Sequence, residues 1–505
     1  MSPTVPKEDG QPTGMGLELP PRPVIYEINT WLWLAELSSR HGTPVTLDTI
    51  PAVEWDILTA LPVDAVWFMG VWERSPAGVA LALQNEILRK AFVDALPDVT
   101  PEDIVGSPYS VRQYEVDQHL GGRDGLAAAR AELAARGIGL ILDFVPNHVA
   151  PDHPWSLSHP EYFIQGTTDD LNRAPGEFFR AGKAIIAHGR DPNFPPWPDV
   201  AQLNAFHPGL REAIIETLID IGGQCDGLRC DMAMLMTTPI FRRTWGERAG
   251  ETPVQEYWLE ILPVVRAAHA HLCLIAEVYW DMEVDMQRQG FDYCYDKELY
   301  DRLIHGTAES VHDHLTADLD YQEQLVRFIE NHDEPRAAAT FGEEQVRTVA
   351  LAAMTLPGAK LLHQGQFEGY RVRLPVFLAR RPVEPVDASL QFFYRRLLPL
   401  LRLPALREGE WRLCALDGWP DNMSCNNLVA WSWKTGDERV VIVINLSPFL
   451  SQGRVQLAWP DLAEQNWVFE DVLSGSVYEH YGDEILNLGL YVNLTAWDRH
   501  FFVVL

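Results

Sequence analysis

The sequence predicts an α/β fold in which a parallel (β/α)8 barrel, a TIM barrel, is followed by a C-terminal antiparallel β domain. Between about residues 24 and 365, short apolar runs alternate with segments in which apolar residues recur at helical spacing. Most of these runs are too continuously apolar for half-exposed strands, which is typical of a parallel sheet covered on its faces. From about residue 410, alternating apolar and polar residues between turn residues indicate antiparallel strands. The 505 residues suffice for two or three domains, one of them a barrel of about 250 residues.

Eight apolar runs are the expected barrel strands. They are VIYEIN (24–29), AVWFMG (65–70), LILDFV (140–145), DGLRCDM (226–232), LCLIAEV (272–278), FDYCYD (291–296), LVRFIEN (325–331) and AKLLHQG (359–365). Helices are expected between them, for example over 125–137 and 209–223. Eight strands fit a closed barrel better than a six-stranded open sheet. No G-x-G-x-x-G follows the first run, which argues against a dinucleotide-binding fold.

Two long excursions interrupt the alternation of strands and helices. Residues 71–108 follow the second run and include an expected helix over 80–96, and residues 149–207 follow the third run without a clear period. In a barrel, such excursions lie at the C-terminal ends of the strands, where active sites are built. The expected domains are a disordered leader (1–23), a catalytic barrel (24–408, with the 149–207 excursion domain after its third strand) and a C-terminal β-sandwich (409–505).

The composition excludes several classes of partner. A net charge of −31 repels nucleic acid and anionic membranes. The sequence contains no run of 18 apolar residues, which is about the length needed to span a bilayer. The first residues have neither a basic nor an apolar segment of the kind that forms a secretion signal, so a cytoplasmic protein is expected. The six cysteines form no C-x-x-C pair, which favours buried free thiols over disulfides or a zinc site.

Polar clusters stand at or just beyond the ends of four expected strands. They are Asp143, Asn147 and His148; Arg229 and Asp231; Glu277; and Asn331, His332 and Asp333. A single charged residue at a strand end is most often just a solvated terminus. Four clusters that a barrel would bring to one face predict an active site.

The four clusters resemble the signature motifs of the α-amylase superfamily of glycoside hydrolases and transglycosylases. The matching segments are DFVPNH (143–148), GLRCD (227–231), AEVYW (276–280) and ENHD (330–333), in the order and at the intervals usual for that family. The resemblance covers roughly residues 24–505. It implies a retaining enzyme that breaks or transfers α-glucosidic bonds by double displacement.

The resemblance implies a role for each matching residue. Asp231 would be the nucleophile, Glu277 the general acid/base, and Asp333 the carboxylate that binds sugar hydroxyls in the transition state. The implied substrate-binding residues are Arg229, which would also keep Asp231 ionised, Tyr109 as an aromatic platform, and His148 and His332 as donors to sugar hydroxyls. Asp143 and Asn147 would support this geometry, and Arg336 would be a structural ion-pair partner.

Several positions depart from the family pattern. Met234 and Leu235 stand where starch-cleaving members commonly carry Lys-His, a pair whose His helps to frame a calcium site. No cofactor is therefore expected to be required, although a structural calcium with Asn147 as a ligand stays possible. The short motif near the end of the second excursion, VAQLN (200–204), is unlike the versions of this motif in amylases and oligo-glucosidases. Gln113 stands where many family members have Asp. The subfamily is left unassigned.

These observations favour hydrolysis or glucosyl transfer on short α-glucosides, with a small carbohydrate as the partner. The alternatives are an endo-acting α-amylase and, from another class, a catalytically inactive binding or scaffold relative; a metal-dependent barrel hydrolase ranks lower. We expect the 71–108 excursion to form a wall or a lid over the sugar site. The aromatic residues of the other excursion either close the pocket or pack that excursion's own core; they are Trp155, Phe163, Phe178, Phe179, Phe194 and Trp197.

Overall fold

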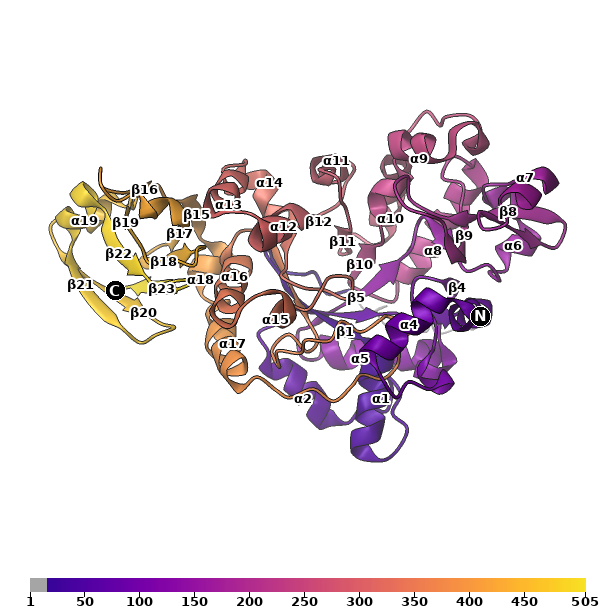
Figure 1. Cartoon of the computed structure of the whole chain (residues 1–505), viewed down its shortest axis with the longest axis horizontal. Helices are drawn as coiled ribbons and strands as arrows, with labels where there is room; N and C mark the ends of the chain where they lie inside the picture. Colours follow the sequence, from indigo (N-terminus) through magenta and orange to yellow (C-terminus); the bar gives the residue numbers. More distant parts are fainter. Residues whose placement is uncertain (1–15) are drawn as a thin grey trace, which may run out of the picture.

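The computed structural model describes residues 16–505 and contains a closed barrel of eight parallel strands (Figure 1). In spatial order the barrel runs β1-β14-β13-β12-β11-β10-β5-β2. Its strands are β1 (Val24–Asn29), β2 (Ala65–Met69), β5 (Gly139–Phe144), β10 (Gly227–Cys230), β11 (Cys273–Ala276), β12 (Tyr293–Tyr295), β13 (Leu325–Arg327) and β14 (Ala359–His363). The predicted barrel is confirmed, and all eight predicted strands take part in it.

Helices cover the outside of the barrel and fill the connections between its strands. The longer ones are α1 (Thr30–His41), α2 (Ala52–Ala60), α5 (Gly122–Ala134), α8 (Pro208–Gly222), α9 (Thr238–Trp245), α10 (Tyr257–Ala268), α12 (Lys297–His305), α13 (Ala308–Leu315), α16 (Glu343–Thr355) and α17 (Ala388–Leu400). Shorter ones are α11 (Glu283–Arg288), α14 (Leu319–Glu323), α15 (Ala337–Thr340) and α18 (Pro404–Glu408). No helix within residues 16–505 has the length and apolar character needed to cross a bilayer.

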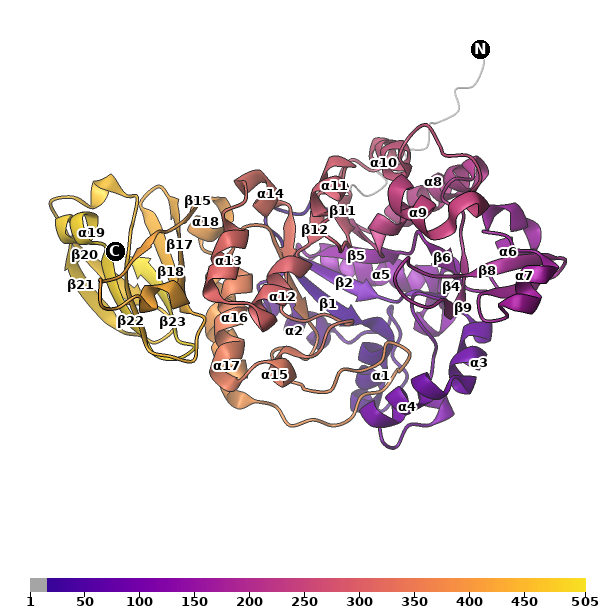
Figure 2. The same ribbon diagram turned by 45° about the horizontal axis from the view of Figure 1, so that its top comes forward.

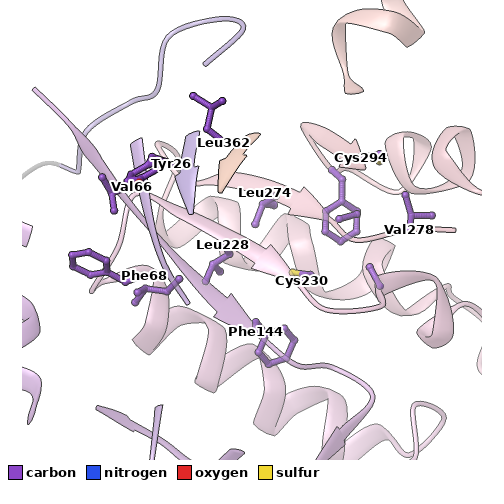
Figure 3. Packing of buried hydrophobic residues seen from close by; sticks show 14 of the residues in the cluster. Tyr26, Val66, Phe68, Phe144, Leu228, Cys230, Leu274, Val278, Cys294 and Leu362 are labelled. Atoms are coloured by element: carbon purple, nitrogen blue, oxygen red, sulfur yellow. The ribbon is translucent and has the colours of Figure 1, made fainter. Parts of the chain in front are cut away.

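The barrel strands are buried on both faces, which explains their continuous apolar runs. Along β1, Val24, Tyr26 and Ile28 face outward into the core beneath the helices, whereas Ile25 faces the barrel interior. Figure 3 shows the outward cluster, to which Val66 and many neighbours from the other strands contribute. Alternate residues of one strand thus serve two different apolar layers.

The first excursion contains two helices where the sequence predicted one over 80–96. It consists of β3 (Trp72–Arg74), α3 (Pro76–Gln84), α4 (Glu86–Ala95) and β4 (Val111–Val116). Asn85 adopts an extended conformation between the helices, and its side chain accepts hydrogen bonds from the N–H groups of Ile87 and Leu88. The single-helix prediction is wrong because Asn85 ends one helix and caps the next.

The second excursion contains a small antiparallel sheet with the strand order β6-β9-β8-β7. Its elements are β6 (His148–Val149), α6 (Trp155–Ser158), α7 (Thr168–Arg173), β7 (Phe178–Ala181), β8 (Ala184–Gly189) and β9 (Trp197–Gln202). Figures 1 and 2 place it at the end of the molecule opposite the C-terminal sheets.

The C-terminal region forms two antiparallel sheets, with the strand orders β15-β17-β18-β23-β20-β21 and β16-β19-β22. The strands are β15 (Glu410–Leu413), β16 (Leu416–Asp417), β17 (Leu428–Thr435), β18 (Glu438–Asn445), β19 (Ser451–Val455), β20 (Asn466–Asp471), β21 (Val477–Tyr481), β22 (Leu490–Leu494) and β23 (Arg499–Val504). A helix unforeseen in this region, α19 (Gly482–Leu488), follows β21. The antiparallel domain is confirmed, and the expected division at residue 409 stays a prediction.

The C-terminal sheets are joined to the barrel by a shared apolar layer. Val441 and Val443 of β18 face the core between the two sheets, whereas Val440 and Ile442 face the barrel. Trp433 of β17 lies in that barrel-facing layer, and its indole N–H donates to the carbonyl of Thr355 at 2.8 Å.

The predicted disordered leader, residues 1–23, needs a correction at its end. Residues 1–15 lie outside the described residues, whereas residues 16–23 contact the barrel. The N–H of Leu17 donates to Asp226 Oδ1 at 2.9 Å, and Arg22 forms an ion pair with Glu323 at 2.6 Å. These contacts fix a segment whose polar, proline-rich composition suggested disorder.

Candidate active site

The carboxyl ends of four barrel strands converge on one cavity of about 450 Å³. Asp231 directly follows β10 and Glu277 directly follows β11, while Asp333 lies beyond β13. All three side chains line this cavity, together with Tyr109 and His148. The structure therefore brings the sequence-predicted catalytic residues into one space.

Arg229 is the buried cation of the cavity floor. It lies two residues before Asp231, so both side chains point to the same side of β10. Its guanidinium contacts Asp231 Oδ1 at 2.9 Å, Glu277 Oε2 at 2.8 Å and Asp143 Oδ1 at 3.4 Å. One positive charge thus holds three carboxyl groups close together.

Crowding of these carboxyl groups changes their acidity. Burial, and next the negative charge of Glu277, raise the pKa of Asp231 well above its usual range, although Arg229 opposes the shift. Burial also raises the pKa of Asp143 to about 6, again against the effect of Arg229. Burial and the charge of Glu277 thus make ionisation of Asp231 harder, and Arg229 is the nearby charge that opposes this effect.

His332 connects Asp333 to the barrel wall. Its Nε2 lies 2.8 Å from Asp333 Oδ2 and 2.7 Å from the hydroxyl of Tyr109, and its Nδ1 lies 2.5 Å from Glu27 Oε1. Burial opposes protonation, but the charges of Asp333 and Glu27 raise the pKa of His332 well above its usual range. Burial also opposes ionisation of Asp333, but His332 lowers the pKa of Asp333 to about 2. This arrangement keeps a negative charge where a sugar hydroxyl would donate.

His148 is a neutral group in the cavity wall. It is buried, and this burial lowers its pKa to about 4. Its ring packs 5.4 Å from the ring of Trp197. A neutral imidazole can donate one N–H to a ligand without adding charge to the site.

Helices α3 and α4 of the first excursion form one wall of the cavity, and β9 of the second forms another. Among the six aromatic residues expected near the site, all of them described, only Trp197 lines the cavity. Trp155, Phe163, Phe178 and Phe179 pack within the protein core, and Phe194 is exposed. The first excursion is therefore a wall, as expected, whereas the second closes the cavity mainly through the strand that contains Trp197.

Comparisons with known proteins agree with this geometry. No family model matches the chain. The α-amylase MalA of Haloarcula japonica is 26% identical over 389 residues, which are 75% of this chain and 53% of the relative. An α-1,4-glucan:maltose-1-phosphate maltosyltransferase of Rhodospirillum rubrum is 23% identical over 493 residues, 92% of this chain and 62% of the relative. The chain thus spans little more than half the length of these curated relatives.

A solved structure shares the whole architecture. The maltogenic α-amylase AmyB of Thermotoga neapolitana superimposes with a TM-score of 0.66 at 18% identity, covering 95% of this chain and 98% of that one. The fold, the motif order and the curated relatives agree on the family. These similarities to α-amylases and a maltosyltransferase support the resemblance to the α-amylase superfamily.

The position at which α-amylase-superfamily members can bind calcium has a different environment in this chain. Asn147 Oδ1 accepts a hydrogen bond from the side-chain amide of Gln202 at 2.8 Å, and its amide nitrogen lies 3.2 Å from His148 Nδ1. Within residues 16–505, no group of three or more His, Cys, Asp or Glu side chains is placed to hold a metal. Asn147 Oδ1, the atom that would bind the ion, is therefore engaged by Gln202, and a calcium ion requires six to eight oxygen ligands.

Arg336 lies away from the reacting groups. It contacts Glu330 Oε1 at 3.0 Å and donates to the carbonyl of Gln364 at 2.9 Å. Met234 and Leu235, the other positions singled out by comparison with amylase-superfamily members, are buried in the core outside the cavity.

Four side chains around the superfamily's motifs escaped the sequence prediction. The hydroxyl of Tyr279 donates to Glu277 Oε1 at 2.6 Å, and the indole N–H of Trp67 donates to Asp143 Oδ2 at 3.1 Å. Glu27 supports His332, and the hydroxyl of Tyr295 accepts from Arg229 Nε at 3.3 Å. A lone glutamate within the apolar run VIYEIN was the one clear signal for Glu27, and Tyr279 lies inside the motif AEVYW.

Proposed function

We propose that the protein is a retaining enzyme that hydrolyses short α-glucosides or transfers their glucosyl group. The observation that carries the proposal is the contact of one buried guanidinium, that of Arg229, with both Asp231 and Glu277. Two carboxyl groups held together in this way suit double displacement, in which the nucleophile and the acid lie about 5–5.5 Å apart.

The first step forms one bond and breaks another. Asp231 attacks the anomeric carbon and forms a covalent glucosyl ester, while the bond to the leaving oxygen breaks and Glu277 transfers its proton to that oxygen. Arg229 donates to Asp231 Oδ1 at 2.9 Å and so stabilises the nucleophilic carboxylate against burial and the nearby Glu277, both of which raise the pKa of Asp231. The N–H of Met232 and the hydroxyl of Tyr279 donate to the Glu277 carboxyl and fix its orientation.

In the second step, Glu277 acts as a base instead of an acid, and Asp231 is the leaving group. Glu277 takes a proton from water or a sugar hydroxyl, whose oxygen attacks the anomeric carbon and releases Asp231. Asp333, held ionised by His332, accepts hydrogen bonds from sugar hydroxyls that strengthen as positive charge develops on the ring.

The walls of the cavity support short substrates. An endo-acting α-amylase needs a groove that passes a polymer on both sides of the catalytic residues, whereas here α3, α4 and β9 stand around the cavity. An inactive binding or scaffold relative is less well supported, because Asp231, Glu277 and Asp333 are all present and line the same cavity.

The test is product analysis with α-glucosyl fluoride, maltose, maltooligosaccharides, sucrose, trehalose, glucose 1-phosphate and soluble starch. We expect turnover of one or more small glucosides and little action on starch. Asp231→Asn and Glu277→Gln should each lower turnover of the best substrate by roughly a thousandfold, because acid/base and covalent steps supply factors of this order. Near-normal activity in either folded variant, or rapid viscosity loss in starch, would contradict the proposal.

The state of the cysteines supports a further proposal about location. All six are buried and unpaired in the structure. Free buried thiols are typical of a reducing compartment, and we therefore propose the cytoplasm.

A further inference from the structure

The catalytic cavity is polar at its floor and apolar along the wall formed by α3 and α4. The wall side chains are Leu81, Ala82, Ile87 and Leu88, and Phe377 from the connection between β14 and α17 continues the same surface. These side chains line the same cavity as Asp231 and Glu277, so a molecule bound at those two carboxyl groups can extend along them.

Two polar side chains on this side of the cavity already accept hydrogen bonds through their oxygen atoms. The side-chain oxygen of Asn85 accepts from two backbone N–H groups at the start of α4, and Ser107 Oγ accepts from the N–H of Tyr109. A sugar bound here would lose water from its hydroxyl groups and gain few hydrogen bonds in return, which costs free energy. An apolar group would gain by leaving water.

The apolar wall is preformed. Phe92 and Leu96 of the excursion pack against Leu378 in a small buried cluster, and the cavity residues Leu88 and Phe377 pack against this cluster. Arg380 secures the same junction, because its guanidinium contacts Asp103 at 2.8 Å. A rigid wall lowers the cost of ordering the site when a ligand binds.

Ile87 is the exposed edge of this wall. Its side chain is 81% exposed although it lines the cavity, and it lies beside Leu88 on the first turn of α4. An isolated exposed isoleucine needs no explanation, but one that continues an apolar cavity surface offers contact area to a ligand.

From this surface we infer that the enzyme prefers α-glucosides whose non-sugar part, the aglycone, is an apolar alkyl or aryl group. The inference rests on the proposed glucoside chemistry and adds its substrate class. The glucosyl group occupies the polar floor, and the aglycone lies along Leu81, Ile87 and Leu88. In transfer, an apolar alcohol would occupy the same surface before Glu277 removes its proton.

The experiment measures kcat/KM for methyl, butyl and hexyl α-D-glucopyranoside, with phenyl α-D-glucopyranoside and maltose alongside. The alkyl leaving groups have nearly equal chemistry, so differences within the series report binding of the chain. We expect kcat/KM to rise by about threefold to fourfold for each methylene that leaves water, and at least tenfold from methyl to hexyl. The value of kcat/KM for the hexyl or the phenyl glucoside should also exceed the value for maltose. Comparing the hexyl with the phenyl glucoside separates a preference for alkyl groups from a preference for aryl groups.

Two variants and a matched control locate the effect. Ile87→Gln and Leu81→Gln should lower the hexyl-to-methyl ratio of kcat/KM at least threefold, and Ile87→Gln carries little risk of misfolding because the side chain is exposed. Val93→Gln changes an exposed apolar residue on the same helix that does not line the cavity, and it should keep the wild-type ratio. A flat alkyl series, or a ratio that neither cavity variant lowers, overturns the inference.

Hydrolysis of α-glucosyl fluoride separates this inference from the proposed function. In α-glucosyl fluoride a single fluorine atom takes the place of the aglycone, so hydrolysis of this substrate tests the catalytic groups alone. If the enzyme hydrolyses α-glucosyl fluoride but kcat/KM stays constant along the alkyl series, the preference for an apolar aglycone is refuted and the proposed function stands. Absence of turnover on the fluoride and on every glucoside refutes both.

Discussion

Arg229 carries the positive charge that allows Asp231, Glu277 and Asp143 to lie side by side in a buried site. Removing the cation would leave uncompensated buried carboxylates, a change that costs roughly 3–5 kcal/mol in measured proteins. The same crowding raises the pKa of Asp231 and Asp143. At the scale of single residues, Arg229 therefore both holds the carboxyl groups together and opposes the rise in the pKa of Asp231 and Asp143.

A prediction about pH follows from the His332–Asp333 pair. The pKa of His332 is raised, so its stabilising contribution is complete below the ordinary histidine value of about 6.5 and is lost as the pH rises through the folded-state pKa. The pKa of Asp333 is lowered to about 2, so its contribution is complete above about 4 and is lost only in strong acid. Stabilisation by the pair should be greatest between pH 4 and 6.5.

The measurement compares Tm of the wild type with that of His332→Gln across pH. The deficit of the variant should be largest near pH 5.5 and should shrink toward pH 9. His159→Gln, at a histidine that is 45% exposed, should change Tm little at any pH. An equal deficit of His332→Gln at pH 5.5 and pH 9 would show that the charge on His332 is not what stabilises the site.

At the scale of elements, the site is built by strand ends and closed by two connections. The α3–α4 excursion and the connection from β14 to α17 meet in the apolar cluster around Leu378, which is fully buried. The two connections pair through an antiparallel bridge between Ile104 and Leu378. This bridge, the apolar cluster and the ion pairs of Arg380 with Asp98 and Asp103 together set the position of the wall.

Leu378→Ala should loosen this wall selectively. A buried Leu→Ala change costs about 2–5 kcal/mol, and here the loss should fall on the junction of the two connections. Hydrogen–deuterium exchange should accelerate by an order of magnitude or more over residues 76–105 while the barrel strands keep their protection. Leu83→Ala, at a partly exposed site on α3, is the control and should have little effect. Uniform acceleration over the whole chain would contradict a local role.

Sequence reasoning located elements well where a local pattern determines them. The barrel strands are continuous apolar runs, and the four polar clusters follow them at short intervals, so strand positions and site residues were both visible. The pairing of Glu27 with His332 was not visible in the sequence, because this contact joins the first and seventh barrel strands and depends on barrel closure. The break at Asn85 was missed because its capping role depends on the direction the chain takes next. The sheet of the second excursion includes strands of two to six residues, too short to show a period.

At the scale of the whole molecule, the barrel lies between two antiparallel units, one inserted after β5 and one at the C-terminus (Figure 2). The first contributes Trp197 and Val200 to the cavity, and the second packs against the barrel through Trp433. The inserted unit thus forms part of the cavity wall, whereas the C-terminal sheets pack against the barrel from outside.

The environment of Asn147 leads us to propose that the enzyme needs no metal. Two carboxyl groups suffice for the chemistry, and the side-chain amide of Gln202 already donates to Asn147 Oδ1, the expected calcium ligand. Incubation with EDTA should leave kcat and Tm within about twofold and about 2 °C of the untreated enzyme. Loss of activity that calcium alone restores would contradict this proposal.

The central claim is that Asp231 forms a covalent intermediate while Glu277 acts as acid and then base. Two inversions at the anomeric carbon give net retention, so the first product of α-glucosyl fluoride hydrolysis must be α-glucose. Proton NMR, recorded in the first minutes before mutarotation, distinguishes the two anomers directly. We predict the α-anomer signal first, followed by slow growth of the β-anomer. Initial appearance of β-glucose would show a single displacement and would contradict the account.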